Sequence, residues 1–236
     1  MVQLNRSERR PARKPARRSR KRGRRGPAGR DGTAEQQILD AAHTVFLRHG
    51  TSGARMQDIA GEAGVNQALL HYYFRTKERL SEAVFQRAAA QLLPRVIEVM
   101  ASDLSIEDKV SRVVDLELDH LLRAPYLPGY IISELHHHPE RVRQLVSAMT
   151  GLMPEEVRQK VFVGLRRQLE TGAQEGRLRT MTPDQFIVNL FSLCIFPFAA
   201  RPMLMVLLGF DQQGFERFIS HRREQLASFI LAAMRP

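Results

Sequence analysis

Several side chains between Gln67 and Lys77 could make hydrogen bonds to a nucleic acid. Gln67 carries an amide group that can pair with the edge of adenine. His71 and Tyr72 can donate hydrogen bonds to phosphate oxygens, and Lys77 can add a positive charge beside them. These residue types, so close together in the chain, indicate a surface that reads bases and also holds the phosphate backbone.

The residues beside them are compatible with close approach to a duplex. Ala68 is small and leaves room for the DNA, while Leu69 could contact the methyl group of a thymine. Asn66 is a residue type that often caps the start of a helix. We therefore expect a short helix whose outer face lies in the major groove.

Two short helices joined by a tight turn would position this surface. The segments expected to be helical are Met56 to Ala63 and Gln67 to Phe74. Gly64 can adopt the left-handed conformation that ends the first helix, and Ala60 is small enough to let the helices cross closely. Val65 lies just outside the second helix and can pack onto it. This pattern is typical of a helix-turn-helix.

The inner face of the second helix carries the residues that would anchor it. Leu70 and Phe74 lie four positions apart and therefore point to the same side of the helix. If this side packs into a core, Gln67, His71 and Tyr72 turn outward or partly outward. The four-residue spacing of Leu70 and Phe74 thus predicts both the exposed polar face and the buried face that anchors the helix.

A second interpretation of this pattern remains open. The same spacing fits a simple corner between two helices in any helical protein, with His71 and Tyr72 as ordinary residues at its rim. The chain would then be a helical module that binds a ligand or a protein partner, without sequence-specific DNA binding. Binding to palindromic DNA separates the two interpretations.

The rest of the chain predicts helices and no strands. Thr33 and Gln36 form a capping box at the start of one helix, which Gly50 would end, and Thr76 can cap the next long helix. Further helices are expected at roughly 106–123, 127–138, 140–150, 155–175, 183–208 and 213–234. We therefore expect an all-α protein with a small front unit and a larger helical body.

An apolar run from Phe186 to Phe210 is too interrupted to predict a membrane span. Two prolines, an asparagine and Arg201 divide it, so we expect two buried helical pieces and no membrane partner. Cys194 in this run is the only cysteine of the chain, and it is expected to be inert core. Because no intramolecular disulfide can form, the sequence favours a cytoplasmic protein in a reducing compartment.

The positive charge of the chain is concentrated at its N-terminal end. Residues 1–30 hold thirteen Lys or Arg and one acid, whereas the remaining 206 residues hold 23 basic and 24 acidic residues. A block of like charges with Pro and Gly is normally disordered and often binds polyanions. We therefore expect a disordered Arg-rich arm over residues 1–30, attached to an almost neutral globule.

The sequence contains none of the common motifs for catalysis or nucleotide binding. P-loop, GxGxxG, HExxH and GxSxG patterns are absent, so we expect no enzyme activity and no cofactor. The segment ELHHHPE, residues 134–140, could supply zinc ligands. However, three histidines at a helix end are more typical of a solvated terminus, and no metal site is assigned.

Residues 33–92 resemble the DNA-binding domain of TetR-family transcriptional regulators. The resemblance rests on DIAGEAGVNQALLHYYFRTKERL, which follows the helix ILDAAHTVFLRHG. The residues that stand in the family's register are Ile59, Ala60, Gly64, Val65, Leu70, Phe74, Lys77 and Leu80.

Two positions differ from the family pattern. Ala54 stands where a Thr usually caps the second helix, a role that Ser52 could take, and His71 stands where Tyr is commoner.

The resemblance implies a two-part plan. Residues 31–92 would bind double-stranded DNA, and residues 93–236 would form a helical domain that dimerises and binds a small effector. A homodimer would place two recognition helices about 34 Å apart, one duplex turn, on a palindromic operator. The protein would act as a repressor that a small apolar effector releases, and the sequence leaves the effector's pocket residues unknown.

The resemblance also completes the set of candidate site residues. The DNA-contact candidates are Ser52, Arg55, Asn66, Gln67, Ala68, Leu69, His71, Tyr72 and Lys77. By analogy, the last two long helices would pair with their symmetry mates in a four-helix bundle, which their apolar richness also favours. The dimerisation candidates are Phe215, Phe218, Ile219, Leu226, Phe229 and Ile230.

Deleting residues 1–30 should weaken DNA binding in a salt-dependent way. Each phosphate contact contributes about 0.9 to the slope of log K against log salt, so loss of the arm should flatten this slope. Fluorescence anisotropy with one DNA duplex over a range of salt concentrations measures the effect. An unchanged slope would show that the arm makes no phosphate contacts.

Overall fold

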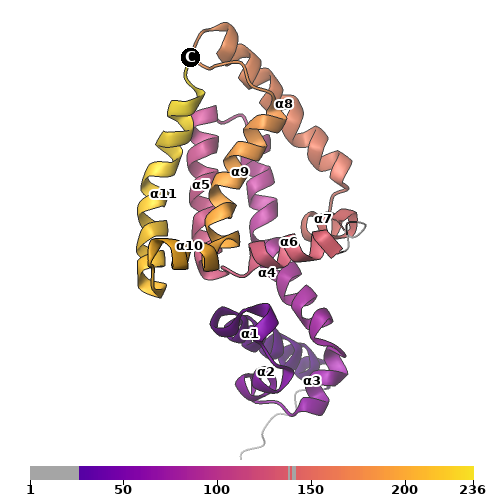
Figure 1. Cartoon of the computed structure of the whole chain (residues 1–236). Coiled ribbons are helices and arrows are strands. Elements are labelled where there is room, and N and C mark those ends of the chain that lie inside the picture. Colours follow the sequence, from indigo (N-terminus) through magenta and orange to yellow (C-terminus); the bar gives the residue numbers. More distant parts are fainter. Residues whose placement is uncertain (1–26, 138, 140–141) are drawn as a thin grey trace, which may run out of the picture.

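The computed structural model describes residues 27–137, 139 and 142–236. Strands are absent from these residues, which confirms the prediction of an all-α protein. The helices are α1 (Pro27–Gly53), α2 (Met56–Ala63), α3 (Gln67–Tyr73), α4 (Lys77–Ala101), α5 (Ile106–Arg123), α6 (Leu127–His137), α7 (Val142–Thr150), α8 (Pro154–Gln174), α9 (Pro183–Ala199), α10 (Arg201–Leu208) and α11 (Gln212–Met234). In Figure 1, α1 to α3 form a small unit at one end of the molecule, and α4 leads from it into the larger body.

The front unit, made of α1 to α3 and the first half of α4, encloses its own hydrophobic core. The α1 residues expected in this core are all buried: Ile38, Ala41, Ala42, Val45 and Phe46. Leu80 and Val84 of α4 pack against the same core. Apolar contacts therefore hold α1 to α3 onto the start of α4.

The start of α1 differs from the sequence prediction. The helix begins at Pro27, so Thr33 lies inside the helix instead of capping it, and residues 27–30 of the expected disordered arm are helical. Proline suits a first helical position, because its φ is already helical and its missing N–H has no partner there. Gly50 ends the regular part of the helix as predicted, with φ of 68°. Residues 1–26 of the arm lie outside the described residues.

α4 is one continuous helix that belongs to both units. It runs to Ala101, so the domain boundary expected at residues 92–93 falls within it, and Pro94 does not end it. Pro94 and Ala90, whose carbonyl loses its helical partner, are both exposed, so water can satisfy that carbonyl. Phe85 in the first half of α4, and Val96 and Met100 in its second half, pack into the body core.

α5 is the central helix of the body and packs against α4, α9 and α11. Its Lys109 is fully buried, and Nζ donates a hydrogen bond of 2.6 Å to Oε1 of Gln168 in α8. The Nε2 of Gln168 donates in turn to the carbonyl of Leu104, at 2.8 Å. Burial lowers the pKa of Lys109. This chain of hydrogen bonds ties α8 to the start of α5.

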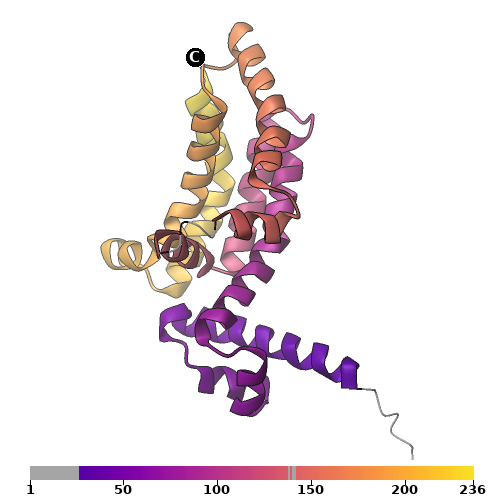
Figure 2. The same cartoon turned by 90° about the vertical axis from the view of Figure 1, so that its right-hand side faces the viewer.

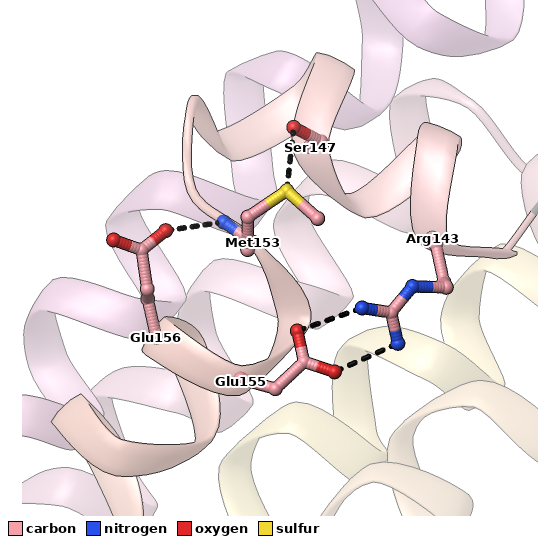
Figure 3. A network of polar contacts seen from close by, with 5 residues as sticks. All are labelled: Arg143, Ser147, Met153, Glu155 and Glu156. Carbon is pink, nitrogen blue, oxygen red and sulfur yellow. Dashed lines mark hydrogen bonds and ion pairs between the residues drawn. The ribbon is translucent and has the colours of Figure 1, made fainter.

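A polar network closes the corner between α7 and α8 (Figure 3). Arg143 donates to both carboxylate oxygens of Glu155, at 2.7 and 3.0 Å. The backbone amide of Met153 donates a hydrogen bond of 2.7 Å to Oε2 of Glu156, and Ser147 Oγ lies 3.8 Å from the sulfur of Met153. Both glutamates lie in the first turn of α8, where negative charge is favoured.

The apolar run from Phe186 to Phe210 forms α9 and α10, which are bent by 69° from each other. The expectation of two buried pieces is wrong for α10, which has no buried residue. The bend directs α10 away from the body core, and the short helix projects outward in Figure 2. Among the described residues, no single helix is long and apolar enough to cross a membrane. The bent pair of α9 and α10 taken together meets that requirement by length and composition only.

Most of the residues predicted for dimerisation on α11 face the core of the same chain. Four of the six candidates are buried in the body core of the same chain: Phe215, Ile219, Leu226 and Ile230. They are therefore not available to a second copy, because α11 uses this face to pack against α5. Phe218 is half-buried, and Phe229 is 60% exposed.

Glu117 of α5 places a carboxyl group among the apolar residues of the body. Its exposed fraction is 5%, and burial raises its pKa to about 7. The thiol of Cys194 in α9 is also buried, and burial and then the charge of Glu117 raise its pKa to about 12. Cys194 is therefore an inert core thiol, as the sequence predicted.

Glu117→Gln should stabilise the protein more at pH 8 than at pH 5. Because the folded pKa lies above the unfolded value near 4.5, the wild type loses stability as pH rises from about 4.5 to about 7, whereas glutamine does not titrate. The shift corresponds to about 3 kcal/mol. Thermal unfolding followed by circular dichroism measures the difference, with Glu107→Gln on the exposed side of α5 as control. An equal gain in Tm at both pH values would contradict a titrating buried carboxyl.

Candidate DNA-binding surface

A left-handed glycine sets the angle between α2 and α3. Gly64 follows α2 with φ of 65° and ψ of 27°. The amide of Val65 donates 3.1 Å to the carbonyl of Ala60, and the amide of Gly64 donates 3.2 Å to that of Gly61. The carbonyls at the end of α2 therefore have partners, and the chain turns directly into α3, as the sequence predicted.

The inner side of α3 is fixed in the front-unit core. Leu70 is fully buried and Phe74 is 6% exposed, and both pack with Ile59 and Ala60 of α2. Asn66 caps α3 as expected, because its Oδ1 accepts a hydrogen bond of 2.7 Å from the amide of Leu69. α3 is thus held by its cap at one end and by apolar contacts along one face.

The outer side of α3 carries the polar candidates. Gln67, Ala68, His71 and Tyr72 are exposed, and Leu69 is half-buried beside them. Tyr72 is 75% exposed, and its ring meets Tyr73 edge to face at 5.3 Å. The residues predicted to contact bases therefore share one accessible face of a fixed helix.

His71 and Lys77 have partners that limit how each could bind phosphate. Nδ1 of His71 lies 3.3 Å from the carbonyl of Arg75, which can only accept, so Nδ1 carries a proton. A neutral His71 would then present an acceptor at Nε2, and only the imidazolium form could donate to a phosphate. Nζ of Lys77 donates 2.8 Å to the carbonyl of Ser52, which leaves two of its three protons for other acceptors.

The start of α2 lacks a side-chain cap. The cap position is occupied by Arg55, whose side chain makes no capping hydrogen bond, and Ala54 before it is 2% exposed. The resemblance implies a cap at position 54, one residue before the cap position that the structure shows. Ser52 does not take the cap position either, which belongs to Arg55, and its carbonyl accepts the hydrogen bond from Lys77. Arg55 and Ser52 are both exposed beside α2.

Arg75 is a further basic residue at this surface that is not among the residues predicted from the sequence. It is exposed in the short segment that connects α3 to α4, next to the capped N-terminus of α4. A basic residue directly after a recognition helix was the signal that could have identified it. Its carbonyl also holds His71, so it belongs to the same surface.

A family model describes much of this front unit. Residues 38–84 match the model for bacterial regulatory proteins of the tetR family, which spans most of α1, all of α2 and α3, and the start of α4.

The front unit of the chain is an N-terminal domain of the TetR family.

Individual relatives agree with this assignment. The chain is 35% identical over 119 residues to the HTH-type transcriptional repressor SCO4008 of Streptomyces coelicolor, an alignment that covers 48% of the chain and 60% of that repressor. It is 27% identical over 140 residues to the HTH-type transcriptional regulator BetI of Rhizobium meliloti, covering 58% and 67% of the two chains. The chain therefore spans less than two thirds of SCO4008.

A solved structure shares the fold of the chain. HlyIIR, a hemolysin II transcriptional regulator, matches with a TM-score of 0.53 and 23% identity over 87% of this chain and 99% of HlyIIR. The relatives that the chain matches are named as transcriptional regulators, and the family model covers the unit that carries the candidate surface.

Proposed function

We propose that this protein is a TetR-family repressor that binds a palindromic operator as a homodimer and leaves it when a small apolar effector binds. One observation carries the proposal: the polar residues of α3 are exposed on one face, while the opposite face is buried in the front-unit core. The name of the SCO4008 relative, a transcriptional repressor, supports repression over activation.

α3 would lie in the major groove with Gln67 toward the bases. The amide of Gln67 can donate to and accept from adenine, a pair worth about 1–3 kcal/mol of discrimination. Ala68 would let the helix approach closely, and the half-buried Leu69 would contact a thymine methyl group. Asn66 would hold the helix start in place through its cap.

Residues around α3 would hold the phosphate backbone. Lys77 offers its two remaining protons next to the N-terminus of α4, where the helix dipole favours an anion. Tyr72 near the end of α3 and Arg75 directly after it are both exposed. Arg55 and Ser52 would add contacts beside α2, and His71 would contribute when protonated.

The dimer interface would use the exposed sides of α9, α10 and α11. Of the thirteen exposed large apolar side chains among the described residues, seven lie in these helices, which makes this the richest apolar part of the surface. On the long helices they are Val188, Phe196 and Phe229. Arg222 of α11 donates to the carbonyl of Leu193 in α9 through Nη2 and Nε, at 3.0 and 3.3 Å, so the two helices are linked. A two-fold axis beside this face would form a four-helix bundle.

Release from the operator would pass through α4. This helix packs in both cores, so an effector that moves its second half also moves the front unit. Two recognition helices in a dimer must match the half-site spacing of the operator, and a change in α4 alters that spacing. The effector must bind the DNA-incompetent arrangement more tightly for repression to end.

Gln67→Ala and Lys77→Ala should weaken operator binding in different ways. Operators are first selected from a pool of palindromic duplexes, and affinities are then measured by gel shift. Gln67→Ala should cost about 1–3 kcal/mol and relax sequence preference at one position of each half-site. Lys77→Ala should weaken binding to all sequences similarly and reduce the salt slope by about 1.

Lys160→Ala, at an exposed lysine of α8, is the matched control and should bind the operator normally. If the wild-type protein selects no sequence from the pool, the operator proposal fails. The chain would then fit the alternative function, a helical module that binds a ligand or partner.

Phe229→Glu should convert the dimer into monomers. A charge at this 60% exposed position would be buried in the proposed interface without a partner, so the dimer dissociation constant should rise at least about tenfold. Light scattering after size-exclusion chromatography measures the mass. Val163→Glu on α8, where Val163 is 67% exposed, is the control and should leave the mass unchanged. Identical masses for wild type and Phe229→Glu would exclude this interface.

A further inference from the structure

A cleft of about 1220 Å³ lies where the front unit meets the body. One wall is formed by the end of α1, Phe46–Ser52, and by the first turns of α4. The other wall is formed by the start of α6, by the α9–α10 bend and by Gln212. A small molecule in this cleft would therefore touch both units at once.

The floor of the cleft is aromatic. Phe46, Phe74 and Phe198 line it and are nearly buried, while Tyr126 and Tyr130 are half-buried and present more of their surface. Flat apolar groups pack favourably against such rings. The cleft thus offers a place for an apolar body of aromatic or aliphatic character.

The charged groups of the cleft favour an anion. Its lining includes four Lys or Arg and one His, but only two acids, Glu78 and Glu82. Arg48 is paired with Glu62 at 2.8 Å, and Lys77 is held by Ser52. The remaining basic side chains in the lining are those of His49, Arg79 and Arg201.

Arg201 stands at the α9–α10 bend with an unused hydrogen-bond donor. Its guanidinium lies over the ring of Phe215 at 5.0 Å and donates through Nη2 to Gln212. Its Nε is buried and has no acceptor among the described residues. Because buried donors are normally satisfied, a shift of this side chain toward an anionic oxygen in the cleft would give Nε the acceptor that it lacks.

We propose that this cleft binds a small amphipathic anion, with an apolar body on the tyrosine floor and a carboxylate or similar group at Arg201. The site would be an effector site, and in that respect the inference rests on the proposed function. It also names the class of effector: an apolar molecule with one acidic group.

Tyr126 connects this site to the position of the front unit. Its hydroxyl is 2.5 Å from Nδ1 of His43 in α1, and its ring meets Phe46 edge to face at 5.8 Å. Tyr126 packs partly against both hydrophobic cores. A ligand beside Tyr126 therefore binds with an affinity that depends on how the two units are placed, which is the condition for regulation.

Two fluorescent probes with similar aromatic bodies test the anion requirement in the full-length protein. The first, 8-anilinonaphthalene-1-sulfonate, is an anion, and the second, N-phenyl-1-naphthylamine, is neutral. We expect tighter binding of the anion. Arg201→Gln should weaken the sulfonate probe at least about tenfold and the neutral probe less than about twofold. Equal losses, or none, would overturn the role of Arg201.

Filling the cleft tests its location. Gly129 of α6 lies in the lining, and a Cβ there would meet no atom within 4 Å. The leucine side chain of Gly129→Leu should enter the cleft and weaken the binding of both probes at least about tenfold. It should not destabilise α6, because leucine is a better helix former than glycine. Gly164→Leu is the matched control, because this α8 glycine also faces open space. Unchanged binding to Gly129→Leu would place the probes elsewhere and overturn the site.

Operator binding is measured separately, with and without the sulfonate probe. We expect the probe to lower the operator affinity of the wild type and not that of Gly129→Leu. If the probe fills the cleft while operator affinity stays constant, the regulatory role is overturned. If the wild type selects no operator, the proposed function fails, whereas the probe titrations still decide whether the cleft is a binding site.

Discussion

The recognition surface depends on the burial of one side of a very short helix. α3 spans only Gln67–Tyr73, and isolated helices of this length are not stable in water. The buried Leu70, the Phe74 ring and the Asn66 cap supply what its own hydrogen bonds cannot. Because these contacts are made on the inner face, the exposed residues of the outer face are not needed to fill the core. The outer face can therefore carry residues chosen for a partner.

The α9–α10 bend has two consequences in the body. It turns α10 outward, which adds apolar side chains to the surface proposed as the dimer interface. It also brings Arg201 to the cleft beside the front unit. A second copy and a small ligand would thus act on neighbouring parts of the same bend. This arrangement would link subunit pairing to ligand binding through a few residues.

The elements that local chemistry specifies could be predicted from the sequence, and those that depend on packing could not. Gly64, Asn66 and Thr76 define α2, α3 and the start of α4, because glycine turns and caps act over a few residues. Four of the six α11 candidates pack inside their own chain, since apolar periodicity cannot distinguish a core inside one chain from an interface between two. The cleft joins Tyr126 and Arg201 to α1, and no local pattern indicates that these distant segments meet.

The continuity of α4 through Pro94 makes this helix a lever. With 25 residues it is about 37 Å long, at 1.5 Å per residue. A tilt of about 5° at the body end would displace the opposite end by roughly 3 Å, the length of a hydrogen bond. Small rearrangements near Met100 could thus be amplified into the loss of contacts between α3 and the DNA groove that it is proposed to enter, without any unfolding of α4.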